Sequence, residues 1–335
     1  MPSVGLIGLG AIVQKHVATI GVLDTFEIAC VCDTDASRRD RWQRETGASA
    51  FADYRDLLVT APDVVVIALP HALHEPVATA ALGAGCHVIV EKPMAVSVAS
   101  CRRMLAAARQ RERALLVAET ACFEPGVMET GRRFADGGLG RFFTGSIINV
   151  RDYFHAERPA WFLDPALSGG GMFSNVGVHR LATARGCLPG LRPVSVSAAV
   201  AHVPEAAVEA CTSALVRYEH DGAMLYEEVG YFGRPSFPVT GMRFVFEYGL
   251  VAWDQGTWRM MGRDGKEQSC PLPPVDTTYA AVYHNLIRAM EGQAMVPETW
   301  EFAVDAILAQ AAYESGRTGN SIDLLSDAWR IDPDR

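Results

Sequence analysis

The chain of 335 residues has no long hydrophobic run, no excess of basic residues and no tract of low complexity. Its longest apolar run covers only residues 64–69, whereas a membrane-spanning helix needs roughly 20 residues. The 30 Lys and Arg are outnumbered by 39 Asp and Glu, so nucleic acid and anionic membranes are poor partners for this protein. Hydrophobic residues at 49% and charged residues at 21% are typical of globular proteins and exclude disorder and coiled coil.

The sequence also lacks paired cysteines, metal-ligand motifs and a targeting signal. Its eight cysteines are scattered without a C-x-x-C pair, so we expect buried thiols in a reducing compartment. The nine histidines show no H-E-x-x-H spacing, so no metal is predicted, and the G-x-S-x-G motif of serine hydrolases is absent. The N-terminus has neither a basic region with a cleavage site nor a twin-arginine run, so we expect a cytoplasmic protein.

The length is that of about two domains, and the pattern changes once along the chain. Over residues 1–121, short β-rich runs alternate with helical stretches, which is typical of a doubly wound parallel sheet. The strands expected in this α/β domain are residues 4–7, 26–32, 64–68, 87–90 and 114–118.

Over residues 122–335, longer strands joined by short turns predict an α+β domain with a large, open, mainly antiparallel sheet. Helical patterns return at residues 279–290 and 298–315, and an arrangement in which these helices pack back on the first domain stays open. The expected strands are residues 143–153, 194–203, 212–218, 223–231, 243–248, 251–253 and 258–261.

A glycine-rich turn follows the first expected strand. Gly8 and Gly10 stand where a tight turn lets backbone N–H groups approach a pyrophosphate at a helix N-terminus. The third position of this G-x-G-x-x-G pattern, usually Gly or Ala, is Val13. Asp33 lies 20 residues beyond Val13, after the second strand, where its carboxylate can accept hydrogen bonds from a ribose 2′-hydroxyl. Together these features predict a Rossmann-type dinucleotide-binding fold.

The same carboxylate bears on the choice of cofactor. Asp33 would repel a 2′-phosphate, so NAD is favoured over NADP. Arg38 and Arg39 follow closely and could stabilise such a phosphate, so NADP stays open as a second choice.

More specific motifs follow in order along the chain. Glu91-Lys92-Pro93 ends a strand, and residues 169–179 read Gly-Gly-Gly-Met-Phe-Ser-Asn-Val-Gly-Val-His. Together with residues 68–74 and 312–319, they resemble the glucose-fructose oxidoreductase / inositol dehydrogenase (Gfo/Idh/MocA) family. The resemblance implies an NAD(P)-dependent oxidoreductase that transfers hydride between a nicotinamide and a secondary alcohol or ketone of a sugar, sugar derivative or cyclitol.

The resemblance also assigns roles to residues. The family uses its matching Lys and His as an acid/base pair, so Lys92 and His179 are the expected catalytic residues. An imidazole is suited to taking the hydroxyl proton near neutral pH, and an ammonium stabilises the charge that develops on the oxygen. The expected cofactor contacts are Gly8, Gly10, Ala11, Ile12, Asp33, Leu69, Pro70, His71, His74, Glu91 and Lys92.

The segments just before the triple glycine, residues 151–155 and 158–162, combine polar heads with aromatic faces of the kind that grip a sugar or polyol ring. The aromatic residues can equally belong to the core or to a dimer interface. The residues expected to bind substrate are Lys92, Arg151, Tyr153, Trp161, Asn175 and His179.

Two further positions depart from the family pattern. Asn175 stands where the family most often has Asp, so a negative charge near Lys92 and His179 is missing, and we expect both groups to lose their protons more readily. Cys122 stands where the family commonly has Arg or Tyr, so one usual substrate contact is in doubt.

Two alternative functions stay open. Some relatives retain NAD and cleave glycosidic bonds without net redox change, and others bind the dinucleotide as sensors or regulators without catalysis. The departures at Val13, Cys122 and Asn175 favour a sensor, whereas the retained Lys92 and His179 argue against it.

The open face of the antiparallel sheet, too apolar to leave in water, predicts a homodimer or homotetramer. Strands at residues 146–150 and 223–228 would contribute to this interface.

Overall fold

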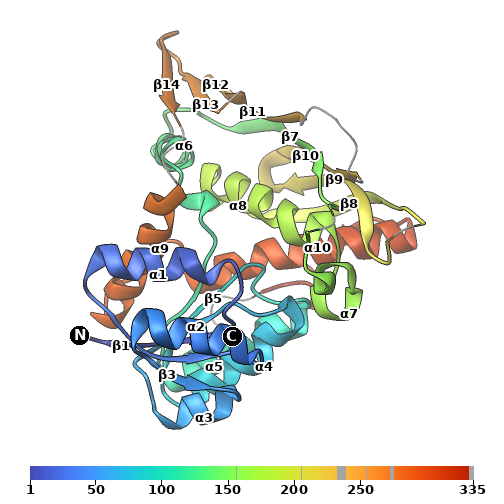
Figure 1. Cartoon of the computed structure of the whole chain (residues 1–335). Coiled ribbons are helices and arrows are strands. Elements are labelled where there is room, and N and C mark those ends of the chain that lie inside the picture. Colours follow the sequence, from blue (N-terminus) through green and yellow to red (C-terminus); the bar gives the residue numbers. More distant parts are fainter. Residues whose placement is uncertain (156, 205, 232–238, 255, 272–274, 332–335) are drawn as a thin grey trace. The chain divides into compact units, whose positions relative to one another are not determined.

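The described chain consists of two compact units (Figure 1). The computed structural model describes residues 1–155, 157–204, 206–231, 239–254, 256–271 and 275–331. The first unit contains Met1–Glu119 and Val275–Ala303, and the second contains Thr120–Pro274 and Val304–Asp332.

The first unit is built on a six-stranded parallel sheet with the order β3-β2-β1-β4-β5-β6, which confirms the predicted doubly wound fold. All four residues of β4 are buried, as expected for a strand covered on both faces. The short β3 was not predicted, because three residues show no periodicity. The strands are β1 (Ser3–Ile7), β2 (Glu27–Cys32), β3 (Ser49–Phe51), β4 (Val64–Ile67), β5 (His87–Val90) and β6 (Leu115–Val117).

The helices of this unit connect its strands, with one addition from late in the chain. Asp35 caps α2 and Ser97 caps α5 by accepting backbone hydrogen bonds, which explains where these helices begin. Helix α9 (Val275–Met290) packs beside α1 (Figure 1). The other helices are α1 (Val13–Leu23), α2 (Ala36–Thr46), α3 (Tyr54–Val59), α4 (His74–Gly83) and α5 (Val98–Arg111).

The second unit is built on a nine-stranded sheet with the order β14-β13-β12-β11-β7-β10-β9-β8-β15. Among the described strands of this sheet only β7 and β10 pair in parallel, which confirms the predicted, mainly antiparallel sheet. The strands are β7 (Phe142–Asp152), β8 (Pro193–His202), β9 (Glu209–Tyr218), β10 (Ala223–Tyr231), β11 (Val239–Phe246), β12 (Gly249–Asp254), β13 (Thr257–Met261), β14 (Glu267–Pro271) and β15 (Ile322–Asp323).

The two faces of this sheet differ. On one face the side chains are buried, and α8 lies along this side (Figure 1). The other face exposes large hydrophobic side chains from five neighbouring strands, as expected for an open face. These side chains are Phe143, Leu225, Val239, Leu250 and Met261.

The second unit contains three short helices that the sequence analysis did not predict. Each of them contains glycines or is bounded by one, and glycine weakens the helical signal in a sequence. The three helices are α6 (Pro125–Ala135), α7 (Pro165–Ser168) and α8 (Val178–Cys187). The long helix α10 (Thr299–Thr318) begins in the first unit and continues in the second.

None of the described helices combines the length and the apolar character needed to cross a membrane. The described cysteines are free thiols, and six of the seven are buried. Within the described ranges, no group of three His, Cys, Asp or Glu side chains is arranged to hold a metal ion.

Candidate active site

The turn after β1 has the shape that a dinucleotide phosphate needs. Gly8 has a φ of 89°, and a Cβ at this position would lie 2.3 Å from the carbonyl oxygen of Ala68. The space around Gly10 is open. No side chain caps α1 at Ile12, so its first backbone N–H groups can bind a pyrophosphate. Val13, which replaces the third glycine, is fully buried. The turn therefore fits the predicted cofactor.

Asp33, at the end of β2, holds this turn in place. Its two carboxylate oxygens accept hydrogen bonds from Leu9 N at 2.8 Å and Asp35 N at 2.9 Å. A carboxylate has about four acceptor sites, so capacity remains for a ribose hydroxyl. The guanidinium of Arg38 lies 3.5 Å from the same carboxylate with 52% of its side chain exposed, whereas Arg39 donates to the carbonyl oxygen of Asp33. Binding of a 2′-phosphate would thus depend on Arg38.

Two buried histidines brace the loops after β4 and β5. The two ring nitrogens of His74 lie 2.9 Å from the carbonyl oxygens of Leu69 and Pro93. Burial lowers the pKa of His74, so its neutral ring donates only one of these hydrogen bonds at a time. His71 lies beside it, with ring centroids 5.6 Å apart. The two histidines position the loops, and their direct contact with cofactor stays a prediction.

Glu91, which precedes Lys92 at the end of β5, is the centre of a buried polar cluster. Its carboxylate accepts hydrogen bonds from His16 Nε2 and from the Tyr279 hydroxyl, each at 3.1 Å. The other ring nitrogen of His16 lies 3.0 Å from the Tyr283 hydroxyl. Burial acts to raise the pKa of Glu91, but the bonds and charge of His16, with the charge of Lys92, outweigh it and lower the pKa. The cluster joins α1, α9 and the Lys92 turn.

In the second unit, close packing explains the glycines before α8. Gly170 has a φ of 156°, and a Cβ there would lie 2.4 Å from the hydroxyl oxygen of Tyr313. A Cβ at Gly171 would lie 2.3 Å from the carbonyl oxygen of Glu209. Any side chain at either position would displace α10 or β9.

Glu209 clamps this glycine-rich segment. Its carboxylate accepts hydrogen bonds from Gly171 N, from Phe173 N at 2.8 Å and from the Tyr313 hydroxyl at 2.7 Å. The Tyr313 oxygen in turn accepts a bond from Ser174 N at 2.8 Å. Burial outweighs these neutral donors, so the pKa of Glu209 is raised. The clamp positions the π-helical turn Phe173–Gly177 that leads into α8.

Asn175 and Tyr153 are brought together within this unit. The Asn175 side-chain amide donates a hydrogen bond to the Tyr153 hydroxyl at 3.2 Å, and that hydroxyl donates to Gly171 O at 3.2 Å. Burial raises the pKa of Tyr153 to about 12, so the phenol is neutral at physiological pH. Asn175 therefore orients a neutral hydroxyl and adds no charge to the site.

The remaining predicted residues lie on separate elements. His179 stands on the first turn of α8 with a partly exposed side chain. Arg151 is exposed near the end of β7, and Trp161 stacks on Phe162 with ring centroids 3.7 Å apart. Lys92 belongs to the first unit and His179 to the second, so their pairing stays a prediction.

A row of polar residues crosses the buried face of the nine-stranded sheet. Thr212, Glu228, Asn149 and Thr240 are paired across β9, β10, β7 and β11. Asn149 donates to one Glu228 oxygen at 2.7 Å, whereas the other oxygen, Thr212 Oγ1 and Arg180 Nε are buried without a hydrogen-bond partner in the described structure. Burial raises the pKa of Glu228 to about 7.

The sequence analysis missed several polar residues that organise these segments. Each lies in a helix or strand that also contains other polar residues, so the sequence gives no clear signal of which polar side chain is buried. These residues are His16, Glu209, Glu228, Tyr279 and Tyr283.

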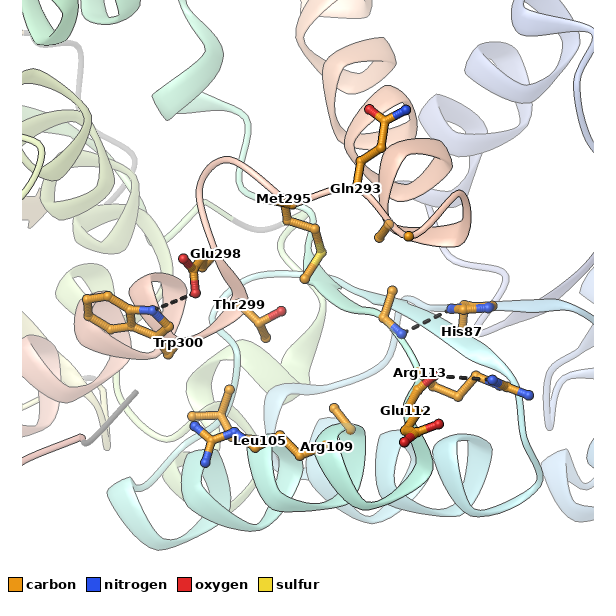
Figure 2. Close-up of a pocket in the computed structure, with 15 residues that line it drawn as sticks. His87, Leu105, Arg109, Glu112, Arg113, Gln293, Met295, Glu298, Thr299 and Trp300 are labelled. Atoms are coloured by element: carbon orange, nitrogen blue, oxygen red, sulfur yellow. Dashed lines mark hydrogen bonds between the residues drawn. The ribbon is translucent and has the colours of Figure 1, made fainter. Parts of the chain in front are cut away.

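A hollow of about 530 Å³ lies elsewhere in the first unit (Figure 2). His87, at the start of β5, lines it together with Arg109 of α5 and Arg113 just after that helix, Met295 from the segment after α9, and Trp300 at the start of α10. Ligands of parallel sheets bind at the carboxyl ends of the strands, where Gly8 stands. The hollow is at the amino ends and is not the candidate active site.

Two family models match the chain in the order of its two sheets. One, described as an oxidoreductase family with an NAD-binding Rossmann fold, matches residues 3–119. The other, the GFO/IDH/MocA C-terminal domain, matches residues 128–262.

Individual proteins agree with these models. The chain is 30% identical over 241 residues to a 1-carboxy-3-chloro-3,4-dihydroxycyclohexa-1,5-diene dehydrogenase of Comamonas testosteroni. That match covers 71% of this chain but only 60%, less than two thirds, of the relative. Inositol 2-dehydrogenase 1 of Saccharopolyspora erythraea is 26% identical over 332 residues, 96% of each chain.

The fold agrees with solved structures as well. A levoglucosan dehydrogenase in complex with NADH and levoglucosan superposes with a TM-score of 0.86, at 18% identity, over 97% of this chain and 100% of that one. Since the family models together cover most of the chain and both of its sheets, the predicted resemblance is confirmed: the chain belongs to the GFO/IDH/MocA family of oxidoreductases with an NAD-binding Rossmann fold.

Proposed function

We propose that this protein is an NAD(P)-dependent dehydrogenase or reductase that acts on a secondary alcohol or ketone of a sugar, sugar derivative or cyclitol. The observation that carries the proposal is Lys92 at the carboxyl end of β5, in a unit whose Gly8 turn fits a dinucleotide. The names of the two relatives, a dehydrogenase of a ring diol and an inositol dehydrogenase, support a hydroxyl on a ring as the reacting group.

In this proposal Lys92 and His179 are the acid/base pair. A bound nicotinamide would supply the acceptor or donor of hydride. His179 takes the hydroxyl proton on a ring nitrogen during oxidation and returns it during reduction. The Lys92 ammonium donates a hydrogen bond to the same substrate oxygen and stabilises its negative charge as the proton leaves. Asn175, bonded to Tyr153, orients the substrate without exchanging protons.

The test is NADH formation by the purified protein with NAD, then NADP, against a panel of cyclitols, aldoses and glycosides. We expect Lys92→Ala and His179→Ala each to lower kcat by at least about 100-fold. Lys266→Ala and His202→Ala are matched controls, because both side chains are exposed on the second unit, and they should retain wild-type kcat.

The same assay separates the two alternative functions. Glycoside cleavage that needs bound NAD but accumulates no NADH would identify a redox-neutral glycosidase. Tight dinucleotide binding without turnover of any compound would identify a sensor or regulator.

We further propose that the protein forms a homodimer or homotetramer through the open face of the nine-stranded sheet. Leu225 lies on the central strand β10 with 39% of its surface exposed, and such a side chain is stabilised by burial in an interface. In light scattering, Leu225→Glu should shift the mass toward the monomer. Met128→Glu on α6, where Met128 is 56% exposed, is the control and should leave the mass unchanged. A monomeric wild-type protein would exclude this interface.

A further inference from the structure

Arg158 carries a positive charge without an ion-pair partner among the described residues. Its guanidinium carbon lies 3.9 Å from the ring centroid of Tyr153 and 5.1 Å from that of Phe162. Its Nε donates a hydrogen bond to the carbonyl oxygen of Tyr153. Besides burial, the groups that act on its charge are Tyr153, then Arg151 and Asp152, and no second hydrogen bond of this guanidinium is found in the described part of the chain.

This isolated charge is costly where it lies. Arg158 is half-buried, and burial lowers the pKa of its guanidinium while the neighbouring charge of Arg151 repels it. The ring of Tyr153 favours the charged form of Arg158, but its phenol is neutral at physiological pH and is not a counter-ion. Charges taken out of water are normally paired, so the missing partner is an anion that arrives with a ligand.

The geometry at Arg158 favours a carboxylate. The bond to the Tyr153 carbonyl and the stacking on its ring hold the plane of the guanidinium. The two terminal nitrogens then present a flat fork of N–H groups, which matches the two oxygens of a carboxylate.

Arg158 is also connected to the segment that carries His179. The hydroxyl of Tyr153, on which Arg158 stacks, is bonded to the Asn175 amide, and Asn175 precedes His179 by about one helical turn. An anion held by Arg158 therefore belongs to the reacting molecule and not to a remote effector.

A second arginine of this unit, Arg180, also supports an anionic ligand. Arg180 follows His179 on α8, and its buried Nε has no hydrogen-bond partner within the described ranges. The charge of Arg180 acts on Glu228, a carboxyl group that gains a proton near neutral pH because burial raises its pKa to about 7. Arg180 is thus a second arginine of this unit, one residue from His179, that Glu228 does not neutralise while this carboxyl group keeps its proton.

We propose that the substrate is a sugar acid or a carboxylated cyclic polyol whose carboxylate is bound by Arg158. The proposal rests on the proposed function, since it names the substrate class of the same site. Arg158 acts here as a specificity-determining residue and takes no part in proton transfer.

The test compares acid and neutral substrates of similar shape, namely glucuronate with glucose and quinate with inositol, on wild-type protein, Arg158→Gln and Arg158→Lys. We expect the wild type to have the higher kcat/KM for the acid. In Arg158→Gln the ratio of acid to neutral kcat/KM should fall roughly 10- to 100-fold, mainly through KM, with a smaller fall in Arg158→Lys. Arg192→Gln, an exposed arginine paired with Glu219, is the control and should keep the wild-type ratio.

Three results would overturn the proposal. The first is an equal loss of kcat/KM for acid and neutral substrates in Arg158→Gln, which would indicate that Arg158 only braces Tyr153. The others are a wild type without preference for acids and a wild type that prefers glucose 6-phosphate to glucuronate. If no compound is turned over, the proposed function fails separately. In that case the carboxylate site is tested by calorimetric titration of the NADH-loaded protein with glucuronate. Binding to the wild type that is lost in Arg158→Gln supports the site, and absence of binding to the wild type excludes it.

Discussion

Glu91 in the first unit and Glu209 in the second are both buried, with 6% and 2% of their surface exposed, yet burial affects their carboxyl groups differently. Glu91 accepts a hydrogen bond from His16 and lies next to Lys92, and its pKa is lowered. Glu209 accepts bonds only from backbone N–H groups and the Tyr313 hydroxyl, and its pKa is raised. The charge of the partners, more than the depth of burial, decides the direction of each shift.

The two shifts have opposite consequences for stability. A lowered pKa in the folded state means that Glu91 stabilises the fold above its ordinary pKa and that this contribution is lost as the pH falls through the folded value. A raised pKa means that the folded state keeps its proton longer at Glu209, so stability falls as the pH rises above the ordinary value. Both glutamates nevertheless serve the same purpose, which is to hold a segment next to a proposed catalytic residue.

Of the substitutions that test this comparison, removal of the Glu91 carboxylate should lower the free energy of unfolding the most. Glu91→Ala leaves His16 Nε2 and the Tyr279 hydroxyl buried without their acceptor, which should cost about 3 to 5 kcal/mol of unfolding free energy. Urea denaturation measures this loss. Glu27→Ala, at an exposed position of β2, is the control and should change stability by less than about 0.5 kcal/mol. A loss equally small in Glu91→Ala would show that the cluster does not hold the Lys92 turn.

A third buried glutamate, Glu228, allows the effect of a raised pKa on stability to be measured as a function of pH. Glu228 faces Asn149 on β7, Thr212 on β9 and Arg180 on α8, and its pKa of about 7 lies above the usual value near 4.5. The folded state therefore binds more protons between these values, and wild-type stability falls as the pH rises through this window. Relative to wild type, Glu228→Gln should gain up to about 3 kcal/mol between pH 5 and pH 8.

Thermal or urea unfolding of both proteins across that window checks this prediction. A constant difference between wild type and Glu228→Gln at all pH values would show that this carboxyl group is not protonated in the folded state.

Replacing one carboxylate oxygen of Glu209, which holds the glycine-rich segment before α8, should lower stability moderately. Glu209→Gln places an amide NH₂ against the donors Gly171 N, Phe173 N or the Tyr313 hydroxyl, which should cost about 2 kcal/mol. Because the clamp leads into α8, kcat should fall together with stability. Glu219→Gln, on the surface of the same unit, provides the comparison and should retain activity. Unchanged kcat in Glu209→Gln would separate the clamp from His179.

The smallest effect should come from the tyrosine hydroxyls of the two clusters. In Tyr313→Phe both a donor to Glu209 and an acceptor for Ser174 N are lost, which should cost about 1 to 2 kcal/mol. In Tyr283→Phe only the contact with His16 is lost, at about 0.5 to 1 kcal/mol. Differential scanning calorimetry would rank the two, and the reverse order would contradict the roles assigned to these hydroxyls.

Local patterns in the sequence were sufficient to predict the parallel sheet, the glycine turn at Gly8 and the mainly antiparallel second sheet. They did not reveal α8, because the glycine-rich residues before it disfavour a helix until Glu209 holds them in place. They also did not reveal β3, which is too short to show an alternating pattern.

The sequence by itself determined the order of strands and helices, the glycines of the cofactor turn and the motifs that place the chain in its family, because these depend on neighbours in the chain. Only the tertiary structure decided which buried groups meet. Glu209 lies 38 residues from Gly171, and Tyr313 lies 139 residues from Ser174. No local pattern encodes such pairs, since they form only when distant segments pack and must satisfy one another's buried polar groups. The same packing left Arg158 without an ion-pair partner among the described residues, which is the observation behind the proposed acidic substrate.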